Sequence, residues 1–405
     1  MTHSESLFRA LKVEDASKVH LTSIRVTAPD TTDLLQHLLS HSDIRPPSDE
    51  NGNTPFTVPK AGVTFSSFSS LFSAQDKSHC ASVFRLGHAL FDPIDLHLKE
   101  EVSDDIQERV YHLRRADALS SWLTRTVSSY VEEDIRNTGS KDSADLAFYY
   151  LTGNQVDKAV ETLVEANHVK LATLIAQVPG APEFREDVRE QLRIWKEEKV
   201  DRYISKPLLK LYALAAGECD IWEGSSRREI VDIAKGLDWL RVLGLQLWYS
   251  ANLGDTLQNT FEVYEQLVKE SDGKLAAPTP FYSESQPKFS ESIVTDGLFN
   301  LMKLGFSIST TLEDALNPLS FSPNPRDYRM PWLLYILLSR CLRAYDFTDR
   351  YLYEAMEDDT GSTQVVEGYS QMSNLLTANF AAQLQQDGLI QEAAYVLLFL
   401  EDDDL

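Results

Sequence analysis

The chain has 405 residues, of which 43% are hydrophobic and 25% are charged, a composition typical of a globular protein with a large core. Its 38 Lys and Arg residues are outnumbered by 62 Asp and Glu residues, so the formal net charge is −24. Such an acidic surface repels phosphate backbones and anionic lipid headgroups. We therefore expect no direct nucleic-acid partner and no membrane attachment through basic residues.

The cysteines and the apolar runs restrict the compartment. Cys80, Cys219 and Cys341 are scattered and odd in number, which argues against a disulfide framework or a Cys-rich zinc site and fits a reducing environment. Charges interrupt every apolar stretch near the start, so no signal peptide is predicted. The longest apolar runs, 332–338 and 393–400, are shorter than the roughly 20 residues that span a bilayer. We expect a soluble, intracellular protein without membrane insertion.

The first 60 residues are rich in proline and predict an extended or loop-like segment. Residues 18–26 are its best strand, because apolar residues occupy alternate positions, whereas a second strand at 56–65 is weakened by Pro59. We expect residues 1–63 to form an N-terminal β or extended segment and residues 64–405 to form a helical domain.

From residue 64 onward, apolar residues recur with the period of a helix and prolines are sparse. Residues 154–178 predict two short amphipathic helices joined by a tight turn, the repeating unit of helical stacks. Further helices are predicted at 78–91, 103–135, 143–152, 183–198, 206–216, 226–235, 237–251, 255–270, 291–306, 310–317, 329–346, 348–357, 369–386 and 389–400. Gly217 and Gly236 are expected to end helices, and residues 271–290 predict a long surface loop.

These elements predict an all-α fold, an irregular stack of antiparallel helices with a short N-terminal β or extended segment. No period of 33 or 34 residues recurs, so the consensus patterns of the common helical repeats are not matched. The aromatic residues of the most apolar helices are expected to pack in the core, with stacking on a ligand as the alternative. They are Trp239, Trp248, Tyr249, Trp332 and Tyr335.

One tripeptide resembles a catalytic motif. Asp359-Thr360-Gly361 matches the short signature of aspartic proteases, whose chemistry needs two carboxylates that share one proton. Here the tripeptide occurs once, in a polar stretch between predicted helices, so we interpret it as a loop.

Other catalytic patterns are weak as well. The closest histidine pairs, His79 with His88 and His97 with His112, lack the spacing of metal ligands. Glycine-rich phosphate-binding motifs and the nucleophile elbow do not occur in the sequence. The cysteines at 80 and 341 lie on apolar faces, where an inert thiol is expected. We expect no enzymatic activity, no catalytic or metal-binding residues and no cofactor.

Four stretches, in order along the chain, resemble one known family. Residues 236–249 contain Leu-Asp-Trp and, farther on, Leu-Trp-Tyr. Residues 150–153 read Tyr-Leu-Thr-Gly, residues 325–332 read Pro-Arg-Asp-Tyr-Arg-Met-Pro-Trp, and residues 382–389 contain Gln-Leu before Gly-Leu, followed by an apolar run. Together they resemble the nucleoporin ninety-six family, known in fungi as the C-terminal product of a self-cleaving nucleoporin precursor.

This resemblance implies a structural scaffold subunit of the Y-shaped coat complex, at the nuclear pore complex of the nuclear envelope. Such a subunit supports pore assembly and the transport of protein and mRNA. The resemblance also implies the fold-back helical domain of vesicle-coat components, with a trunk and a crown, and the crown would lie within residues 154–216.

Two partners follow from the resemblance. One is a WD-repeat β-propeller shared with coat protein complex II, which receives an added blade from the N-terminal region. The other is a second helical nucleoporin, which docks crown to crown. The candidate propeller contacts, which could instead form a strand packed on the chain's own helices, are Val19, Leu21, Ile24 and Val26. The candidate crown contacts, which could instead be core residues, are Leu192, Trp195, Leu208 and Tyr212.

The sequence departs from the family at both ends. The family carries an aromatic, Gly-rich strand upstream of the segment that resembles residues 18–26; we do not find it, and we expect a partial blade that binds the propeller weakly. The chain stops soon after Leu400, where the family continues into a helical tail, so we expect contacts with other Y-complex subunits through that tail to be missing. The alternatives are a vesicle-coat rod subunit, an all-α enzyme that uses Asp359 or a histidine, and a generic helical adaptor.

Overall fold

The computed structural model describes residues 7–15, 18–25, 29–47, 54–98, 102–178, 180–251, 255–271, 273–282, 294–307, 309–350, 352–354, 365–367 and 369–401. The chain divides into two compact units. Unit 1 comprises Met1–Asp92, Pro280–Leu304 and Ser309–Leu405, and unit 2 comprises Pro93–Thr279 and Gly305–Ile308. Because the two ends of the chain belong to the same unit, the chain folds back on itself. The boundary predicted between residues 63 and 64 lies inside unit 1 and does not separate the two units.

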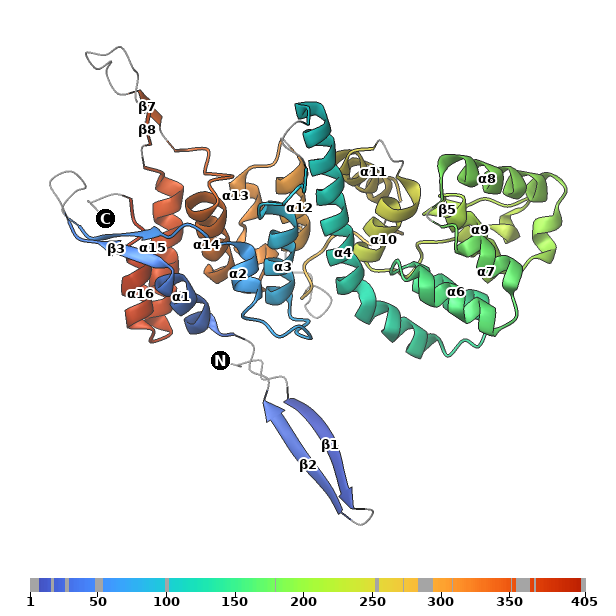
Figure 1. Ribbon diagram of the computed structural model, residues 1–405, viewed down its shortest axis with the longest axis horizontal. Helices are drawn as coiled ribbons and strands as arrows, with labels where there is room; N and C mark the ends of the chain where they lie inside the picture. The colour runs from blue at the N-terminus through green and yellow to red at the C-terminus, as the bar shows by residue number, and fades with distance from the viewer. Residues whose placement is uncertain are drawn as a thin grey trace. The chain divides into compact units, whose positions relative to one another are not determined.

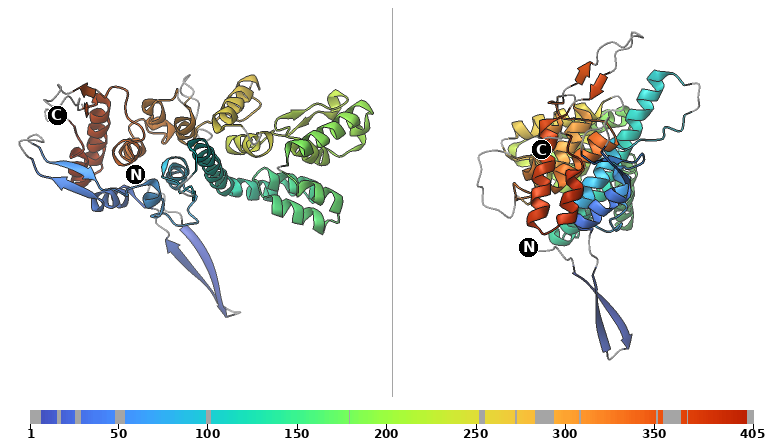
Figure 2. Two further views of the ribbon diagram at one scale, coloured as in Figure 1. Left: turned by 45° about the horizontal axis from the view of Figure 1, so that its top comes forward. Right: turned by 90° about the vertical axis from the view of Figure 1, so that its left-hand side faces the viewer.

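Unit 1 is built from both ends of the sequence (Figure 1). Its N-terminal elements are β1 (Leu7–Asp15), β2 (Lys18–Arg25), α1 (Thr31–Ser40), β3 (Ser42–Arg45), β4 (Phe56–Pro59), α2 (Phe65–Ser69) and α3 (His79–Phe91). Its later elements are α12 (Gly297–Phe306), α13 (Leu312–Ala315), α14 (Arg329–Tyr335), the π-helical turn η6 (Ile336–Cys341), β7 (Leu352–Glu354), β8 (Val365–Glu367), α15 (Gln371–Gln386) and α16 (Ile390–Leu397). Figures 1 and 2 show α1, in blue, beside α16, in red.

Trp332 on α14 is the centre of the later part of unit 1. Its side chain is fully buried, and its indole Nε1 donates a hydrogen bond of 3.1 Å to the hydroxyl of Thr377 on α15. Its ring packs against the rings of Phe380 and Phe399, with centroids 5.1 and 5.4 Å away. A buried indole needs a partner for its N–H group, and Thr377 supplies it. One residue thereby fixes α14 against the hairpin of α15 and α16.

Asp92 connects the early helices of unit 1. Its buried carboxylate accepts hydrogen bonds from the backbone N–H groups of Phe65 and Ser66, at the start of α2, at 2.9 and 2.8 Å. It also lies 2.7 Å from the imidazole of His88, one turn earlier on the end of α3. A carboxylate is favourable at a helix N-terminus, where backbone N–H groups lack partners within the helix. The contact therefore fixes the start of α2 against the end of α3.

Unit 2 is a stack of helices with short irregular insertions (Figure 1). It contains α4 (Asp104–Thr138), α5 (Ser143–Leu151), α6 (Val156–Glu165), α7 (Val169–Ile175), α8 (Pro182–Glu197), the 3-10 turn η1 (Val200–Tyr203), α9 (Lys206–Ala215), β5 (Ile221–Trp222), the 3-10 turn η2 (Arg227–Glu229), β6 (Val231–Asp232), α10 (Trp239–Leu245), the π-helical turn η3 (Gln246–Ser250) and α11 (Leu257–Glu270). Within it, α5 packs on α6 and α9, and α8 packs on α9.

Two buried polar contacts hold the helices of unit 2 together. The phenol of Tyr249 donates a hydrogen bond of 2.7 Å to the carbonyl oxygen of Leu151 at the end of α5. The buried guanidinium of Arg241 on α10 lies 2.7 Å from the carboxylate of Asp134 on α4 and also pairs with Asp238. Losing one partner of such a buried contact lowers the free energy of unfolding strongly, because the other polar group is left buried without a partner. The two contacts therefore fix how α5 and α4 meet the α10–η3 segment.

The structure confirms the all-α fold class and most of the predicted helices. The five aromatic residues predicted for the core are all buried, with exposed fractions of 9% or less. Gly217 has a φ of +86° after α9, as expected for a residue that ends a helix. Among the described residues, no helix is both long and apolar enough to cross a membrane.

Several predicted elements are wrong. The helix predicted at 226–235 is the short turn η2 followed by β6, which pairs with β5, so Gly236 ends no such helix although its φ is +80°. The helix predicted at 348–357 contains β7 instead, which pairs with β8. The predicted extended segment contains the helix α1, and the strand predicted at 56–65 ends at Pro59. Local apolar periodicity does not distinguish a short helix from a short strand pair.

Candidate partner-binding surfaces

The N-terminal hairpin carries the residues predicted to contact a propeller. β2 confirms the strand predicted from residue 18, and it pairs antiparallel with β1, an upstream strand that the sequence analysis did not find. The two strands form a sheet of their own, and no other described strand pairs with their outer edges. Exposed strand edges are the feature on which β-augmentation depends.

The register of this hairpin divides the candidate residues. Leu21 lies opposite Leu11 and Val19 lies opposite Val13, whereas Ile24 lies opposite Phe8. Successive positions of a strand alternate between its two faces. The register position of Ile24 is therefore on the other face from those of Val19 and Leu21, so the candidates divide between the two faces of the hairpin. Val26 lies outside the described residues.

The candidate crown residues lie on α8 and α9, and they differ in burial. Leu192 is 2% exposed, so it belongs to the core of unit 2 and is not an exposed anchor. Trp195 and Tyr212 are half-buried, and their rings form an edge-on pair with centroids 4.8 Å apart. Leu208 is half-buried as well. The Trp195–Tyr212 pair holds α8 on α9 and leaves only part of each ring for a partner.

On α8 and the turn η1, the most exposed apolar side chains are not the predicted crown contacts. Ile194 is 41% exposed, Val200 is 38% exposed and Tyr203 is 85% exposed; we call these three the α8–η1 patch. Ile194 follows Leu192 by two positions, so on a helix it points away from the buried stripe. The signal was present in the sequence as an isoleucine on the polar face of an amphipathic helix. Exposed aromatic and aliphatic side chains close together in the sequence are candidates for a protein-binding site.

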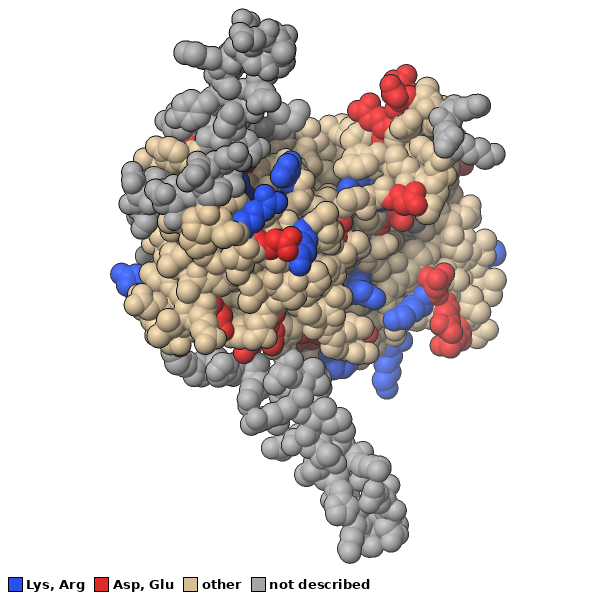
Figure 3. All heavy atoms as spheres, turned by 60° about the vertical axis from the view of Figure 1, so that its left-hand side comes forward, with Lys and Arg blue, Asp and Glu red and all other residues tan. Residues whose placement is uncertain are grey.

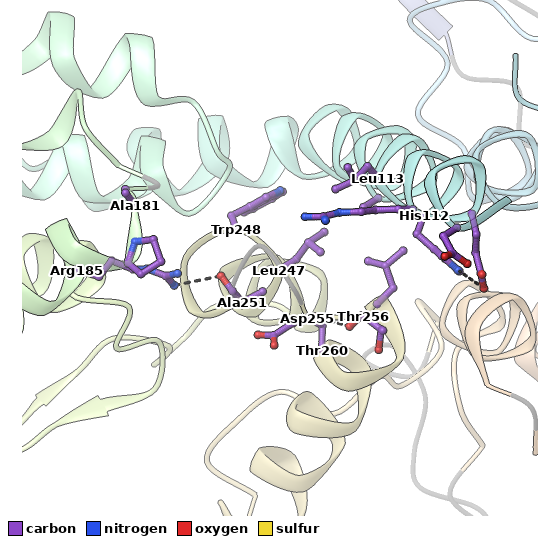
Figure 4. A pocket seen from close by; sticks show the side chains of 17 residues that line it. His112, Leu113, Ala181, Arg185, Leu247, Trp248, Ala251, Asp255, Thr256 and Thr260 are labelled. Carbon is purple, nitrogen blue, oxygen red and sulfur yellow. Dashed lines mark hydrogen bonds and ion pairs between the residues drawn. The ribbon is translucent and has the colours of Figure 1, made fainter. Parts of the chain in front are cut away.

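Unit 2 also contains a groove of about 940 Å³. Figure 4 shows α4 along one side, with His112 and Leu113, and Leu247, Trp248 and Ala251 on the other. Arg185 lies at its end and donates three hydrogen bonds of 2.9 to 3.1 Å to the carbonyl oxygens of residues 249–251. Those are the carbonyl groups that a helix leaves unpaired at its C-terminus, so Arg185 caps the π-helical turn.

Two further polar residues of this groove contact neighbours on their own helices. Thr256 accepts a hydrogen bond from the backbone N–H of Asn259 and thereby caps α11. His112 lies 3.8 Å from Glu108, one turn earlier on the same exposed stretch of α4. Among the described residues, no group of three or more His, Cys, Asp and Glu side chains could hold a metal ion. The groove thus combines apolar side chains with charged ones, Asp105, Arg109 and Asp255 among them.

The cysteines and two of the histidines considered as catalytic candidates can be located in the structure. Burial raises the pKa of the Cys80 thiol to about 11 and that of the Cys341 thiol to about 12, and it also raises the pKa of Cys219. Thiols with such pKa values are uncharged at neutral pH and are poor nucleophiles. His79 and His88 each lie beside a carboxylate, of Asp296 and Asp92. Asp359 and its tripeptide lie outside the described residues.

Comparison with known proteins identifies the family. The sequence model of the family described as Nuclear protein 96 matches residues 145–405, more than half of the chain. The chain belongs to this family. The resemblance seen in its motifs is thereby confirmed.

Relatives from three kingdoms carry matching names. Nucleoporin nup189 of Schizosaccharomyces pombe is 28% identical over 92% of the chain, and the nuclear pore complex protein NUP96 of Arabidopsis thaliana is 29% identical over 75%. The nuclear pore complex protein Nup98-Nup96 of Drosophila melanogaster is 26% identical over 71%. The chain spans only 20%, 26% and 13% of the lengths of these three proteins.

Proposed function

We propose that this chain is a structural scaffold subunit of the nuclear pore complex, within its Y-shaped coat complex, and that it supports pore assembly and the transport of protein and mRNA. The observation that carries the proposal is the family match over residues 145–405. The names of the relatives, which are nucleoporins and nuclear pore complex proteins, support location at the nuclear envelope and favour the pore over a vesicle coat. The work is binding rather than catalysis.

The architecture suits such a role. Interdigitated helices at the density of a protein interior deform little, and each unit has a continuous core of large buried side chains. A brace of this kind needs adhesive surfaces and no reactive group. The described thiols are uncharged, and the described histidines and hydroxyls of the groove are engaged with neighbouring residues.

We propose the N-terminal hairpin as the site for a WD-repeat β-propeller. Two paired strands can add to an open sheet through backbone hydrogen bonds, and β1 pairs with β2 in this way. The sequence of β1, LFRALKVED, contains no glycine, so it is not the aromatic, Gly-rich strand that the family carries. We therefore keep the proposal of a partial blade that binds the propeller weakly.

We propose that the second partner, a helical nucleoporin, docks on residues 154–216 through the α8–η1 patch. A stable interface of this kind buries at least about 1,200–2,000 Å² in total, so further residues of α6 and α7 contribute. Val164 and Val169, which flank the turn between these helices, are 50% and 60% exposed.

Purification of the tagged protein from its native source, with identification of the proteins that accompany it, tests the proposal as a whole. We expect a propeller protein and helical nucleoporins to co-purify. Recovery of vesicle-coat subunits, or of no pore subunit at all, would overturn it.

A further inference from the structure

A small hollow in unit 1 has chemistry unlike that of the rest of this acidic chain. It measures about 530 Å³ and lies between β4 and the loop that follows η6. Three arginines line it, Arg340, Arg343 and Arg350, and the carboxylate of Asp346 is the only acidic group of its lining among the described residues. We call it the arginine hollow. Figure 3 shows a face of the molecule on which basic and acidic side chains are interspersed.

Two of the three guanidinium groups are neutralised by the protein. Arg350 pairs with Asp346 and Glu401, and it is 7% exposed. Arg340 lies 2.9 Å from the same Glu401 carboxylate and remains 31% exposed. The third guanidinium, of Arg343, is exposed, and no described residue forms a hydrogen bond or ion pair with it. Among the described residues, the carboxylates of Asp346 and Glu401 pair with Arg340 and Arg350, and none pairs with Arg343.

The backbone at Arg343 points to a role for its side chain. Its φ is +52°, in the left-handed region, where the chain leaves the π-helical turn. The backbone N–H of Ala344 then closes the turn on the carbonyl oxygen of Leu338 at 2.9 Å. Glycine is the usual residue at such a helix end because it adopts positive φ without strain. Strained residues and π-helical turns both concentrate at functional sites.

The walls of the arginine hollow fit a peptide segment. Phe56, Tyr345 and Phe347 supply apolar surface beside the arginines. The hydroxyl groups of Thr57 and Ser339, in residues that are 7% and 6% exposed, have no hydrogen-bond partner within the described structure. Buried hydroxyl groups without partners are uncommon in folded proteins. Within the part of the chain that the structure describes, the site thus combines a cation that has no ion-pair partner, two hydroxyl groups without hydrogen-bond partners, and apolar walls.

We propose that the arginine hollow binds a phosphorylated serine or threonine side chain of a protein partner. A phosphate carries close to two negative charges and three acceptor oxygens, so it can accept both N–H groups of an arginine fork with more charge than a carboxylate carries. A nucleic acid or an anionic membrane presents many charges, and the net charge of −24 would repel it beyond this hollow. A single phosphorylated residue interacts mainly with the nearby positive charge of the hollow, because salt screens the more distant negative charges of the chain. This goes beyond the scaffold role, since it makes one contact of the scaffold depend on phosphorylation.

The test uses fluorescence anisotropy of the full chain with a labelled peptide, Ala-Ala-phosphoserine-Ala-Ala. We expect binding at sub-millimolar concentration, competition by inorganic phosphate, and much weaker binding of the same peptide with serine or glutamate at the centre. R343Q should weaken binding about tenfold, the loss of one charge-assisted bidentate contact. The matched control is R326Q, which removes the same charge from an exposed site of unit 1 outside the hollow.

A second variant separates binding from folding. R343G removes the guanidinium but suits the positive φ, so we expect it to lose binding while the midpoint of thermal unfolding stays the same or rises. Equal loss in R326Q, equal binding of the serine or glutamate peptide, or no binding by the unaltered chain would each overturn the proposal. So would binding to vesicles with 20% phosphatidylinositol phosphate that needs Arg343 when the phosphopeptide does not bind.

Discussion

Arg350 holds Glu401 with two hydrogen bonds of 2.8 Å, one from each terminal nitrogen of its guanidinium to each carboxylate oxygen. Both side chains are almost fully buried, at 7% and 9% exposed. Glu401 also accepts hydrogen bonds from the phenol of Tyr335 and the backbone N–H of Ser370. The carboxylate therefore joins the end of the C-terminal hairpin to α14 and to the start of α15.

Glu401→Gln should destabilise unit 1 by about 2 kcal/mol, because it removes the carboxylate charge that Arg350 shares with Arg340 and leaves Asp346 as the remaining charge partner of Arg350. Glu165→Gln, an exposed change on α6, should leave the free energy of unfolding within about 0.5 kcal/mol. Urea unfolding at pH 7 measures both. Equal effects of the two substitutions would contradict the importance of the buried pair.

The same pair predicts a pH dependence. Burial raises the pKa of Glu401, but hydrogen bonds from Arg350 and the charge of Arg340 outweigh burial and hold the pKa below its usual value. A carboxyl group whose pKa is lowered by folding stabilises the folded state above its unfolded pKa of about 4.3. That stability is lost as the pH falls through the lower, folded pKa. Between pH 6 and pH 3 the unaltered chain should therefore lose more stability than Glu401→Gln. Urea unfolding at several pH values measures this, and an equal loss of stability in both proteins would contradict the prediction.

In unit 2, Tyr249→Phe should lower the free energy of unfolding by about 1–2 kcal/mol. It removes one of the two hydrogen bonds that the carbonyl oxygen of Leu151 accepts, the other coming from the backbone N–H of Asn154, and changes little else. Tyr203→Phe, at a site that is 85% exposed, is the matched control and should be neutral. Urea unfolding midpoints of the two variants measure this difference, and equal midpoints would contradict the prediction.

The α8–η1 patch predicts the docking of the helical partner. Ile194→Glu with Tyr203→Glu should abolish co-elution with that partner, because two carboxylates would be buried in the interface. Helical content and thermal midpoint should stay unchanged, since both side chains are exposed. Val263→Glu, at an exposed site on α11, is the control. If the double variant still co-elutes, the partner docks elsewhere.

The register of the hairpin predicts which face enters a propeller. Leu11→Asp with Leu21→Asp places two carboxylates at one cross-strand pair, and Ala10→Asp with Thr22→Asp does so at the neighbouring pair on the other face. Both double variants place like charges opposite each other, so thermal unfolding of each must be compared before their binding is. We expect the first to lose propeller binding, measured by calorimetry, and the second to retain it. The reverse result would assign binding to the other face.

The fold class could be predicted because long amphipathic stretches such as residues 104–138 contain enough turns for the helical period to be unmistakable. Residues 226–235 show the limit. The apolar run Ile230, Val231, Ile233 and Ala234 suits a buried strand as well as a helix, and only the pairing of Val231 with Trp222 decides between them. The core aromatics were predictable for the same reason as the helices.

The candidate surfaces were harder to predict than the fold. Leu192 and Ile194 are both apolar residues of α8, yet one is 2% and the other 41% exposed. Their separation by two positions predicts different faces, but which face is covered depends on how α9 packs. The arginine hollow depends on a contact between β4 and η6, which are more than 270 residues apart in the sequence. No local pattern encodes such a meeting.

The division of unit 1 between the two ends of the chain has a consequence for biosynthesis. The ribosome releases residues 1–92 roughly 200 residues before the segment that begins at Ser309, an interval of about 10–40 s at ordinary rates of synthesis. Unit 2 has nearly all of its residues well before that point. We expect it to fold first on the nascent chain, while the apolar faces of α1, α2 and α3 wait for α14, α15 and α16. The early helices are therefore where a co-translational chaperone has most to protect.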